Sequence, residues 1–170
     1  MRILRLAAPV AMLAGLSACG LQPMYAGGSS SAVVRGLDAV QVAPIEGREG
    51  WLVRNALRDR LNPDNTDVSP EYRLDIVLDQ NLEGFGLLTD DTIGRERLTL
   101  RARYQLVEIG TGEILLDATA GSDAGIDVVS SEYATIAAEQ TALENLAREV
   151  ADRIVTSIAL ELRDAGSERR

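Results

Sequence analysis

The sequence predicts an α+β fold, a two-layer sandwich in which two helices cover one face of a four-stranded sheet in the order β-α-β-β-β-α. Two observations carry this prediction. Several segments alternate apolar and polar residues with a period of two, which is typical of strands in a sheet that is covered on one side only. Two other segments repeat apolar residues at steps of three and four, which is typical of amphipathic helices packed on such a sheet.

The first strand and the first helix are expected early in the domain. Residues 37–43 alternate in polarity and predict a strand, which Pro44 ends. Residues 47–50 are predicted to form a loop. Residues 51–61 carry apolar side chains at helical spacing, with several arginines available for the solvent side, and predict a helix. The turn-forming residues that begin at Asn62 end this helix.

Three further strands are expected in the middle of the chain. Alternation is clear in residues 72–79, in residues 95–109 and in residues 113–120. Residues 81–94 contain glycine and aspartate and are predicted to connect the first two of these strands as a loop. Residues 110–112 (Gly-Thr-Gly) predict a tight hairpin turn between the last two.

A long helix is expected over residues 131–163, because apolar residues recur there at three- and four-residue steps. At about 1.5 Å per residue it would be roughly 50 Å long, more than the predicted sheet needs. The domain is therefore expected to span residues 37–164, followed by a polar tail at residues 165–170. Its main apolar positions are Ile136, Leu143, Leu146, Val150, Ile154, Ile158 and Leu162.

The N-terminus has the pattern of a bacterial lipoprotein signal. Arg2 and Arg5 precede an apolar run of about ten residues, which is half of the ~20 that a membrane-spanning helix needs. Small residues then precede Cys19, the one cysteine of the chain. We expect residues 1–18 to be removed and Cys19 to receive a diacylglycerol on its thiol and a further acyl chain, such as palmitate, on its new N-terminus. Two or more acyl chains give stable membrane anchoring.

Residues 19–36 are then expected to form the acylated N-terminus and a flexible Gly/Ser tether, which would let the domain stand off the membrane. The alternative is an ordinary secreted protein whose cysteine is a chance occurrence or a small buried thiol.

Composition excludes several classes of function. The chain has 17 basic residues, all arginine, against 26 acidic ones, and a formal charge of −9 that becomes −11 when Arg2 and Arg5 are removed with the signal. Such an acidic chain is not typical of nucleic-acid-binding proteins. The sequence has no histidine, so it has no His-based catalytic triad and no His-ligated metal. We expect no catalytic residue, metal site or cofactor, and we interpret Asp90-Asp91 as solvated acids rather than as a carboxylate enzyme site.

Four arginines form a row on one predicted strand face, opposite the apolar one: Arg95, Arg97, Arg101 and Arg103. Guanidinium groups pair bidentately with phosphate, so this row is a candidate site for the phosphates of a lipid such as lipopolysaccharide. The alternative is a solvated sheet face, on which acids of the neighbouring strands neutralise the row through cross-strand ion pairs.

The segment 81–94 also carries four apolar residues in a setting that is expected to be exposed: Leu82, Phe85, Leu87 and Leu88. Exposed apolar groups on a loop can mark a partner site. The alternative is that they fold back onto the edge of the sheet.

The chain resembles the LptE family of lipopolysaccharide-assembly lipoproteins, in the form common among alphaproteobacteria. The resemblance rests on residues 19–25 (Cys-Gly-Leu-Gln-Pro-Met-Tyr), on the order of the elements, and on the terminal helix, which opens at residues 131–134 (Ser-Glu-Tyr-Ala) and continues through residues 147–154. It covers about residues 19–164. Leu21 departs from the phenylalanine that is more usual at its position.

The resemblance implies a non-enzymatic lipoprotein that lies on the periplasmic side of the outer membrane. Members of this family act as a plug in the LptD β-barrel and assist lipopolysaccharide transport and outer-membrane assembly, and some bind lipopolysaccharide. Of the family's functional residues only Cys19 carries over, as the acylated residue. Residue 20, directly after the cysteine, is glycine and not the aspartate that retains enterobacterial lipoproteins in the inner membrane, which favours sorting to the outer membrane. The alternative function is an accessory lipoprotein of another envelope transporter, or a periplasmic binding module.

Overall fold

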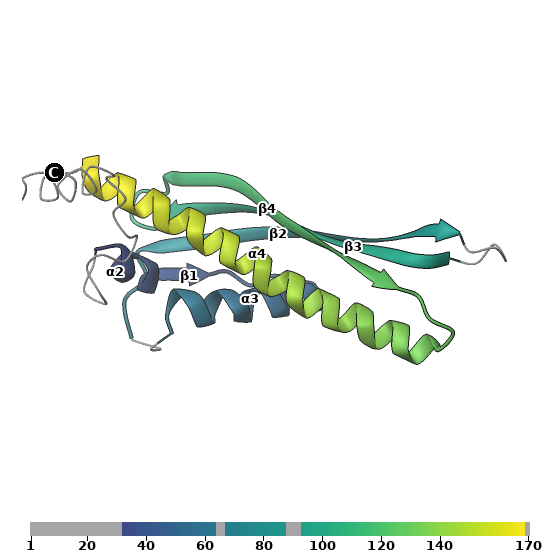
Figure 1. Ribbon diagram of the computed structural model, residues 1–170. Helices are drawn as coiled ribbons and strands as arrows, with labels where there is room; N and C mark the ends of the chain where they lie inside the picture. The colour runs from purple at the N-terminus through teal and green to yellow at the C-terminus, as the bar shows by residue number, and fades with distance from the viewer. Residues whose placement is uncertain (1–31, 64–66, 88–92, 169–170) are drawn as a thin grey trace, which may run out of the picture.

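A computed structural model describes residues 32–63, 67–87 and 93–168 of the chain (Figure 1). Three helices and four strands follow one another in these residues. They are α2 (Ala32–Asp38), β1 (Val40–Val42), α3 (Gly47–Leu61), β2 (Tyr72–Leu87), β3 (Ile93–Glu108), β4 (Ile114–Asp127) and α4 (Glu132–Glu168). The predicted α+β class is confirmed.

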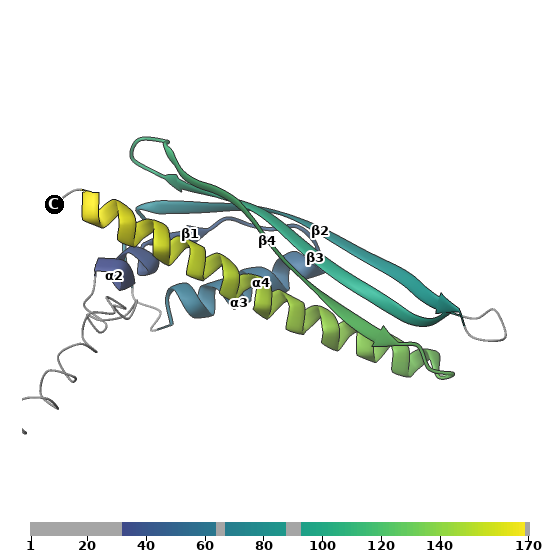
Figure 2. The same ribbon diagram turned by 45° about the horizontal axis from the view of Figure 1, so that its top comes forward.

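The four strands form one mixed sheet in the order β1-β2-β3-β4. The short β1 pairs parallel to β2, while β2, β3 and β4 form an antiparallel meander. Leu74 faces Leu106 and Leu82 faces Leu98 in the β2–β3 register, so residues of the same polarity share a face. Figure 2 shows the sheet as one layer and the helices as the other. The two-layer sandwich is therefore as the alternation predicted.

The core lies between the inner face of the sheet and the helices. Leu100 and Leu106 of β3 and Ile154 of α4 have no exposed surface. Alanines of α4 such as Ala151 are also buried and let the helix lie close to the sheet. The sheet residues that pack on the helices are the even-numbered ones of β2 and β3, since successive side chains of a strand point to opposite faces. The odd-numbered ones therefore form an uncovered outer face, except that Val107, at the β-bulge next to Leu106, is buried.

Helix α4 is as long as the sheet that it crosses. Its 37 residues correspond to about 55 Å, and the 16 residues of β2 correspond to about 53 Å. The sheet nearly matches the helix in length because the strands are longer than predicted. No helix in the described part of the chain combines the length and the apolar character needed to cross a membrane.

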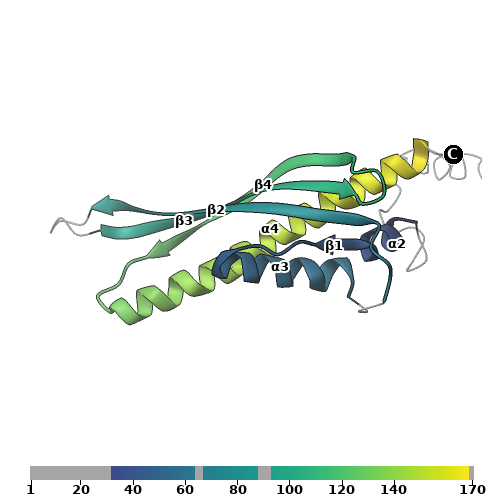
Figure 3. The ribbon, with the colours of Figure 1, turned by 180° about the vertical axis from the view of Figure 1, so that it is seen from behind.

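The strand predicted over residues 37–43 is in fact limited to Val40–Val42. Leu37 and Asp38 end helix α2, which also takes in part of the segment 19–36 that was expected as a flexible tether. The sequence of α2 contains two valines and a glycine and has low helix propensity. Val33 and Leu37 are nevertheless buried in the common core, so tertiary packing overrides local preference. Figure 3 shows α2 at the end of the molecule near the C-terminus, with β1 and α3 extending from there toward the middle.

The loop predicted over residues 81–94 is largely strand. β2 continues to Leu87, β3 begins at Ile93, and β4 continues to Asp127 rather than ending near Ala120. Glycines at these positions suggested turns, but cross-strand pairing extends through them.

The two main helices also differ from the predicted bounds. Helix α3 begins at Gly47, within the predicted loop 47–50. A Cβ on Gly50 would lie 2.7 Å from the Ile45 carbonyl oxygen, so this first turn requires glycine. Helix α4 extends to Glu168, into the segment expected as a polar tail.

Candidate functional site: the outer face of the sheet

One face of the sheet lies away from the helices (Figure 2). The burial and the register of β3 place the predicted arginine row on this face. Arg95, Arg97, Arg101 and Arg103 all lie exposed on β3, and the acids that face them come from the neighbouring strands. The structure therefore brings the four residues together on one surface, but it gives them different surroundings.

Two arginines of the row are neutralised by acids of β4. Arg95 Nε lies 2.9 Å from Asp127 Oδ1, and Arg103 Nη2 lies 3.0 Å from Asp117 Oδ2. Gln105 also donates to Asp117, over 2.9 Å. The hydrogen bonds from Arg103 and Gln105 lower the pKa of Asp117, and the same pairing raises the pKa of Arg103. This half of the row fits the alternative prediction, a solvated face with cross-strand ion pairs.

Arg97 lies over an aromatic ring. Its guanidinium carbon is 5.2 Å from the centre of the Phe85 ring, which is a cation–π distance. Phe85 is on the outer face of β2 because it pairs with Arg95 across the hairpin, and it remains 41% exposed. The ring and the guanidinium together form an exposed surface that is both apolar and cationic.

Arg101 has no ion pair in residues 32–63, 67–87 and 93–168. Its side chain crosses β4 above Gly121, where a Cβ would lie 2.5 Å from Arg101 Cδ. From the helical layer, Arg153 of α4 donates to the carbonyl oxygen of the same Gly121. Arg101 and Arg153 line one shallow hollow at the edge of β4. Arg101 of the sheet and Arg153 of the helical layer therefore both contact Gly121.

Gly121, Arg153 and Asp127 were missed by the sequence reasoning. All three lie beyond the predicted end of the last strand or on the helix, and only the register that pairs Arg101 with Gly121 connects them. The available signal was the alternation of small residues through residues 118–126, which continues the strand past the glycines.

The apolar residues of the segment 81–94 do not share one surface. Leu82 is on the inner face at the far end of the sheet and is 43% exposed, whereas Phe85 is on the outer face. The side chain of Leu87 and the whole of Leu88 lie outside the described residues, as do Cys19 and Asp90-Asp91.

The fold is that of a group of bacterial lipoproteins of known structure. A candidate lipoprotein from Caulobacter crescentus CB15 superimposes with a TM-score of 0.63 at 23% identity, over 77% of this chain and 96% of that one. The rare lipoprotein B from Shewanella oneidensis gives 0.59 at 12% identity, over 74% and 99%. A minor lipoprotein from Acinetobacter baumannii gives 0.53 at 13% identity, over 72% and 91%.

The chain belongs to the LptE lipopolysaccharide-assembly family, whose sequence profile matches residues 37–158. The resemblance inferred from the cysteine motif and the order of elements is thereby confirmed. No curated protein sequence matches the chain. Membership makes the chain a lipopolysaccharide-assembly lipoprotein of the cell envelope, in a family whose role is not enzymatic.

Proposed function

We propose that the chain is an outer-membrane lipoprotein, acylated at Cys19 and held on the periplasmic side, that partners an LptD-like β-barrel in lipopolysaccharide transport and outer-membrane assembly. The observation that carries this proposal is the family match over residues 37–158, which covers all four strands, α3 and α4 up to its last turns. The lipoprotein signal that ends at Cys19 supplies the anchor.

The chain also binds lipopolysaccharide directly in this proposal, through the outer face of the sheet. Lipid A phosphates are anions, and arginine recognises phosphate through two parallel hydrogen bonds. Arg101 supports this role because it forms no ion pair in the described part of the chain, although Asp79 of β2 lies opposite it in the sheet. Arg97 and Phe85 offer a charge beside an apolar ring, which suits a phosphorylated lipid whose acyl chains lie next to its head group.

The partner is tested by affinity purification of the tagged full-length chain from detergent-solubilised outer membranes, with the bound proteins identified by mass spectrometry. We expect a large β-barrel in near-stoichiometric amount. An unrelated outer-membrane lipoprotein with the same tag is the control. Recovery of a transport ATPase complex instead of the barrel would favour the accessory-lipoprotein alternative and overturn the proposal.

The anchor is tested by Cys19→Ala. We expect the variant to leave the membrane fraction for the soluble or precursor pool, because it lacks the acyl chains. Mass spectrometry of the wild-type N-terminal peptide should show the diacylglycerol and the N-acyl group on Cys19. An unmodified N-terminal peptide together with unchanged membrane fractionation would contradict the anchor.

A further inference from the structure

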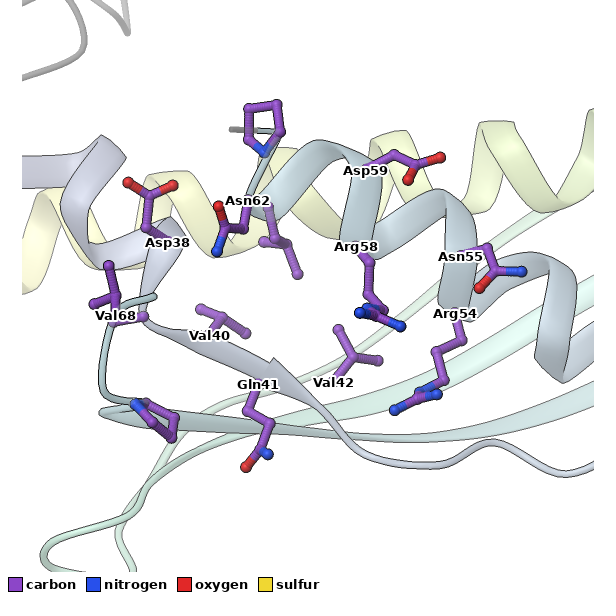
Figure 4. Close-up of a pocket in the computed structure, with 14 residues that line it drawn as sticks. Asp38, Val40, Gln41, Val42, Arg54, Asn55, Arg58, Asp59, Asn62 and Val68 are labelled. Atoms are coloured by element: carbon purple, nitrogen blue, oxygen red, sulfur yellow. The ribbon is translucent and has the colours of Figure 1, made fainter. Parts of the chain in front are cut away.

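A wide hollow among the described residues lies between α3 and the free edge of β1, on a side of the domain that the arginine row does not reach. Its volume is about 960 Å³, within the range of ligand-binding clefts. Val40 and Val42 form one side, α3 forms another, and the segment that contains Val68 and Pro70 closes one end (Figure 4).

The strand edge in this hollow has free backbone groups. The Ala39 carbonyl accepts hydrogen bonds from the Glu71 and Tyr72 amides, and the Ala43 amide donates to Leu74 O over 3.0 Å. In a parallel pair these bonds use alternate residues of the strand, so Ala39, Gln41 and Ala43 face β2. The amide and carbonyl groups of Val40 and Val42 therefore face the hollow, and within the described residues no protein group bonds to them.

Two arginines of α3 reach into the same hollow. Arg54 and Arg58 are one helical turn apart and both extend toward β1, whereas Asp59 points away from it (Figure 4). In the part of the chain that the structure describes, neither arginine forms an ion pair, and the buried Nε of Arg54 has no hydrogen-bond partner. A buried donor without a partner is uncommon in folded proteins and indicates a missing acceptor.

The backbone groups decide which kind of anion fits. A free phosphate would use the arginines and the two amides, but it would also meet the carbonyl oxygens of Val40 and Val42, which repel it. An extended peptide uses both kinds of group, since its own amides donate to those carbonyls while its carbonyls accept from the amides.

The spacing of the arginines fits such a peptide as well. Residues at i and i+4 of a helix are about 6 Å apart, and side chains at i and i+2 of a strand are about 6.6 Å apart. Two acidic side chains on one face of an extended segment would therefore meet Arg54 and Arg58 together.

We propose that the hollow is a docking site for an extended acidic segment of a partner polypeptide, which adds to the edge of β1 as a further strand and places alternate carboxylates on Arg54 and Arg58. The site is separate from the outer face of the sheet and does not depend on lipopolysaccharide.

The test uses the full-length, isotope-labelled chain in detergent and a blocked heptapeptide of sequence Thr-Glu-Thr-Glu-Thr-Glu-Thr. Amide hydrogen exchange is followed by NMR with and without saturating peptide. We expect exchange at Val40 and Val42 to slow by roughly tenfold or more, because their amides gain partners. The Ala43 amide is already bonded to Leu74 and serves as the internal control, with unchanged exchange.

Variants separate the peptide from other anions. Arg54→Gln with Arg58→Gln should weaken peptide binding roughly tenfold or more, since charge-assisted pairs are lost. Arg48→Gln with Arg148→Gln removes the same charge from exposed arginines outside the hollow and should change binding by no more than about twofold. Val42→Pro removes one edge amide without breaking a bond to β2, and it should also weaken binding.

Three results would overturn the proposal. The first is equal binding of the same peptide N-methylated at every residue, and the second is displacement of the peptide by millimolar inorganic phosphate. Both would show a simple anion site. The third is unchanged exchange at Val40 and Val42 in a chain whose NMR spectrum shows that it is folded. None of these results bears on the lipopolysaccharide role, which is tested on the outer face.

Discussion

The side chain of Arg101 lies across the backbone of Gly121 on the neighbouring strand, in space that any other residue would fill. A Cβ at Gly121 would lie 2.5 Å from Arg101 Cδ and 2.6 Å from its Nη1. The glycine is needed here for close approach and not for an unusual backbone angle, since its φ is not in the left-handed region. This contact holds Arg101, which like Arg97 forms no ion pair among the described residues, beside the backbone of β4.

Gly121→Ala should displace Arg101 from this position. We expect lipopolysaccharide binding to fall about as far as in Arg101→Gln, with a loss of unfolding free energy of about 1 kcal/mol or less because the arginine can rotate away. Gly125→Ala is the matched control, because a Cβ at Gly125 of the same strand meets nothing within 4 Å. Equal lipopolysaccharide affinity in both variants would show that the position of Arg101 has no role in binding.

The members of the arginine row should differ in their effect on lipopolysaccharide binding. Arg101→Gln should lower the affinity roughly tenfold, since an unpaired guanidinium is available to a phosphate. Arg103→Gln should have a smaller effect, because Asp117 already occupies that guanidinium. Affinities measured by fluorescence displacement on the purified full-length variants would check this order. If the Arg101→Gln variant binds as tightly as the wild type while remaining folded, the row is only a solvated face.

Glu139 of α4 gives the domain a specific pH dependence. Burial first, and then the charge of Glu96 on β3, raise the pKa of Glu139. The folded state therefore holds this proton more tightly than the unfolded state, so its stabilising effect is complete below pH ~4, near the ordinary pKa of glutamate, and is lost as pH rises through the raised value.

Glu139→Gln should consequently increase the unfolding free energy at pH 7, by up to about 1 kcal/mol. The difference from the wild type should disappear below pH ~4, where Glu139 is protonated in both states. Urea denaturation of both proteins at a series of pH values measures this difference in unfolding free energy. A stabilisation that persists unchanged at low pH would mean that the charge is not its cause.

The packing of α4 on the sheet should account for much of the stability. Ile154 is fully buried, and Ile154→Ala should cost about 2–5 kcal/mol through lost burial and a residual cavity. Leu160 lies on the same helix but is 39% exposed, so Leu160→Ala should cost less than about 1.5 kcal/mol. Thermal or urea unfolding compares the two. Equal losses would contradict the assignment of the core to the Ile154 side of the helix.

The fold class was predictable from sequence because apolar residues recur with a period near two in the strands and near 3.6 in α4. The predicted ends of several helices and strands were wrong. Val33 and Leu37 form a helix only because α4 buries them, and residues 81–87 and 121–127 stay in the sheet only because the neighbouring strands pair with them. Both effects depend on residues far away in the sequence.

The candidate site was predictable in its location but not in its detail. Alternation alone places four arginines on one face of β3. Which of them is neutralised depends on the β3–β4 register, which the sequence does not state: Arg95 meets Asp127, whereas Arg101 meets a glycine. The hollow beside β1 left no signal in the sequence, since Arg54 and Arg58 have the spacing of any solvated helix face.

A sheet with helices on one side only separates the residues that hold the domain together from those that it presents to its surroundings. Substitution of an exposed residue of β3, such as Arg97 or Arg101, alters surface chemistry and leaves the aliphatic interior unchanged. Such a scaffold can diverge widely in sequence and keep its fold, as the 12–23% identities with its structural neighbours illustrate.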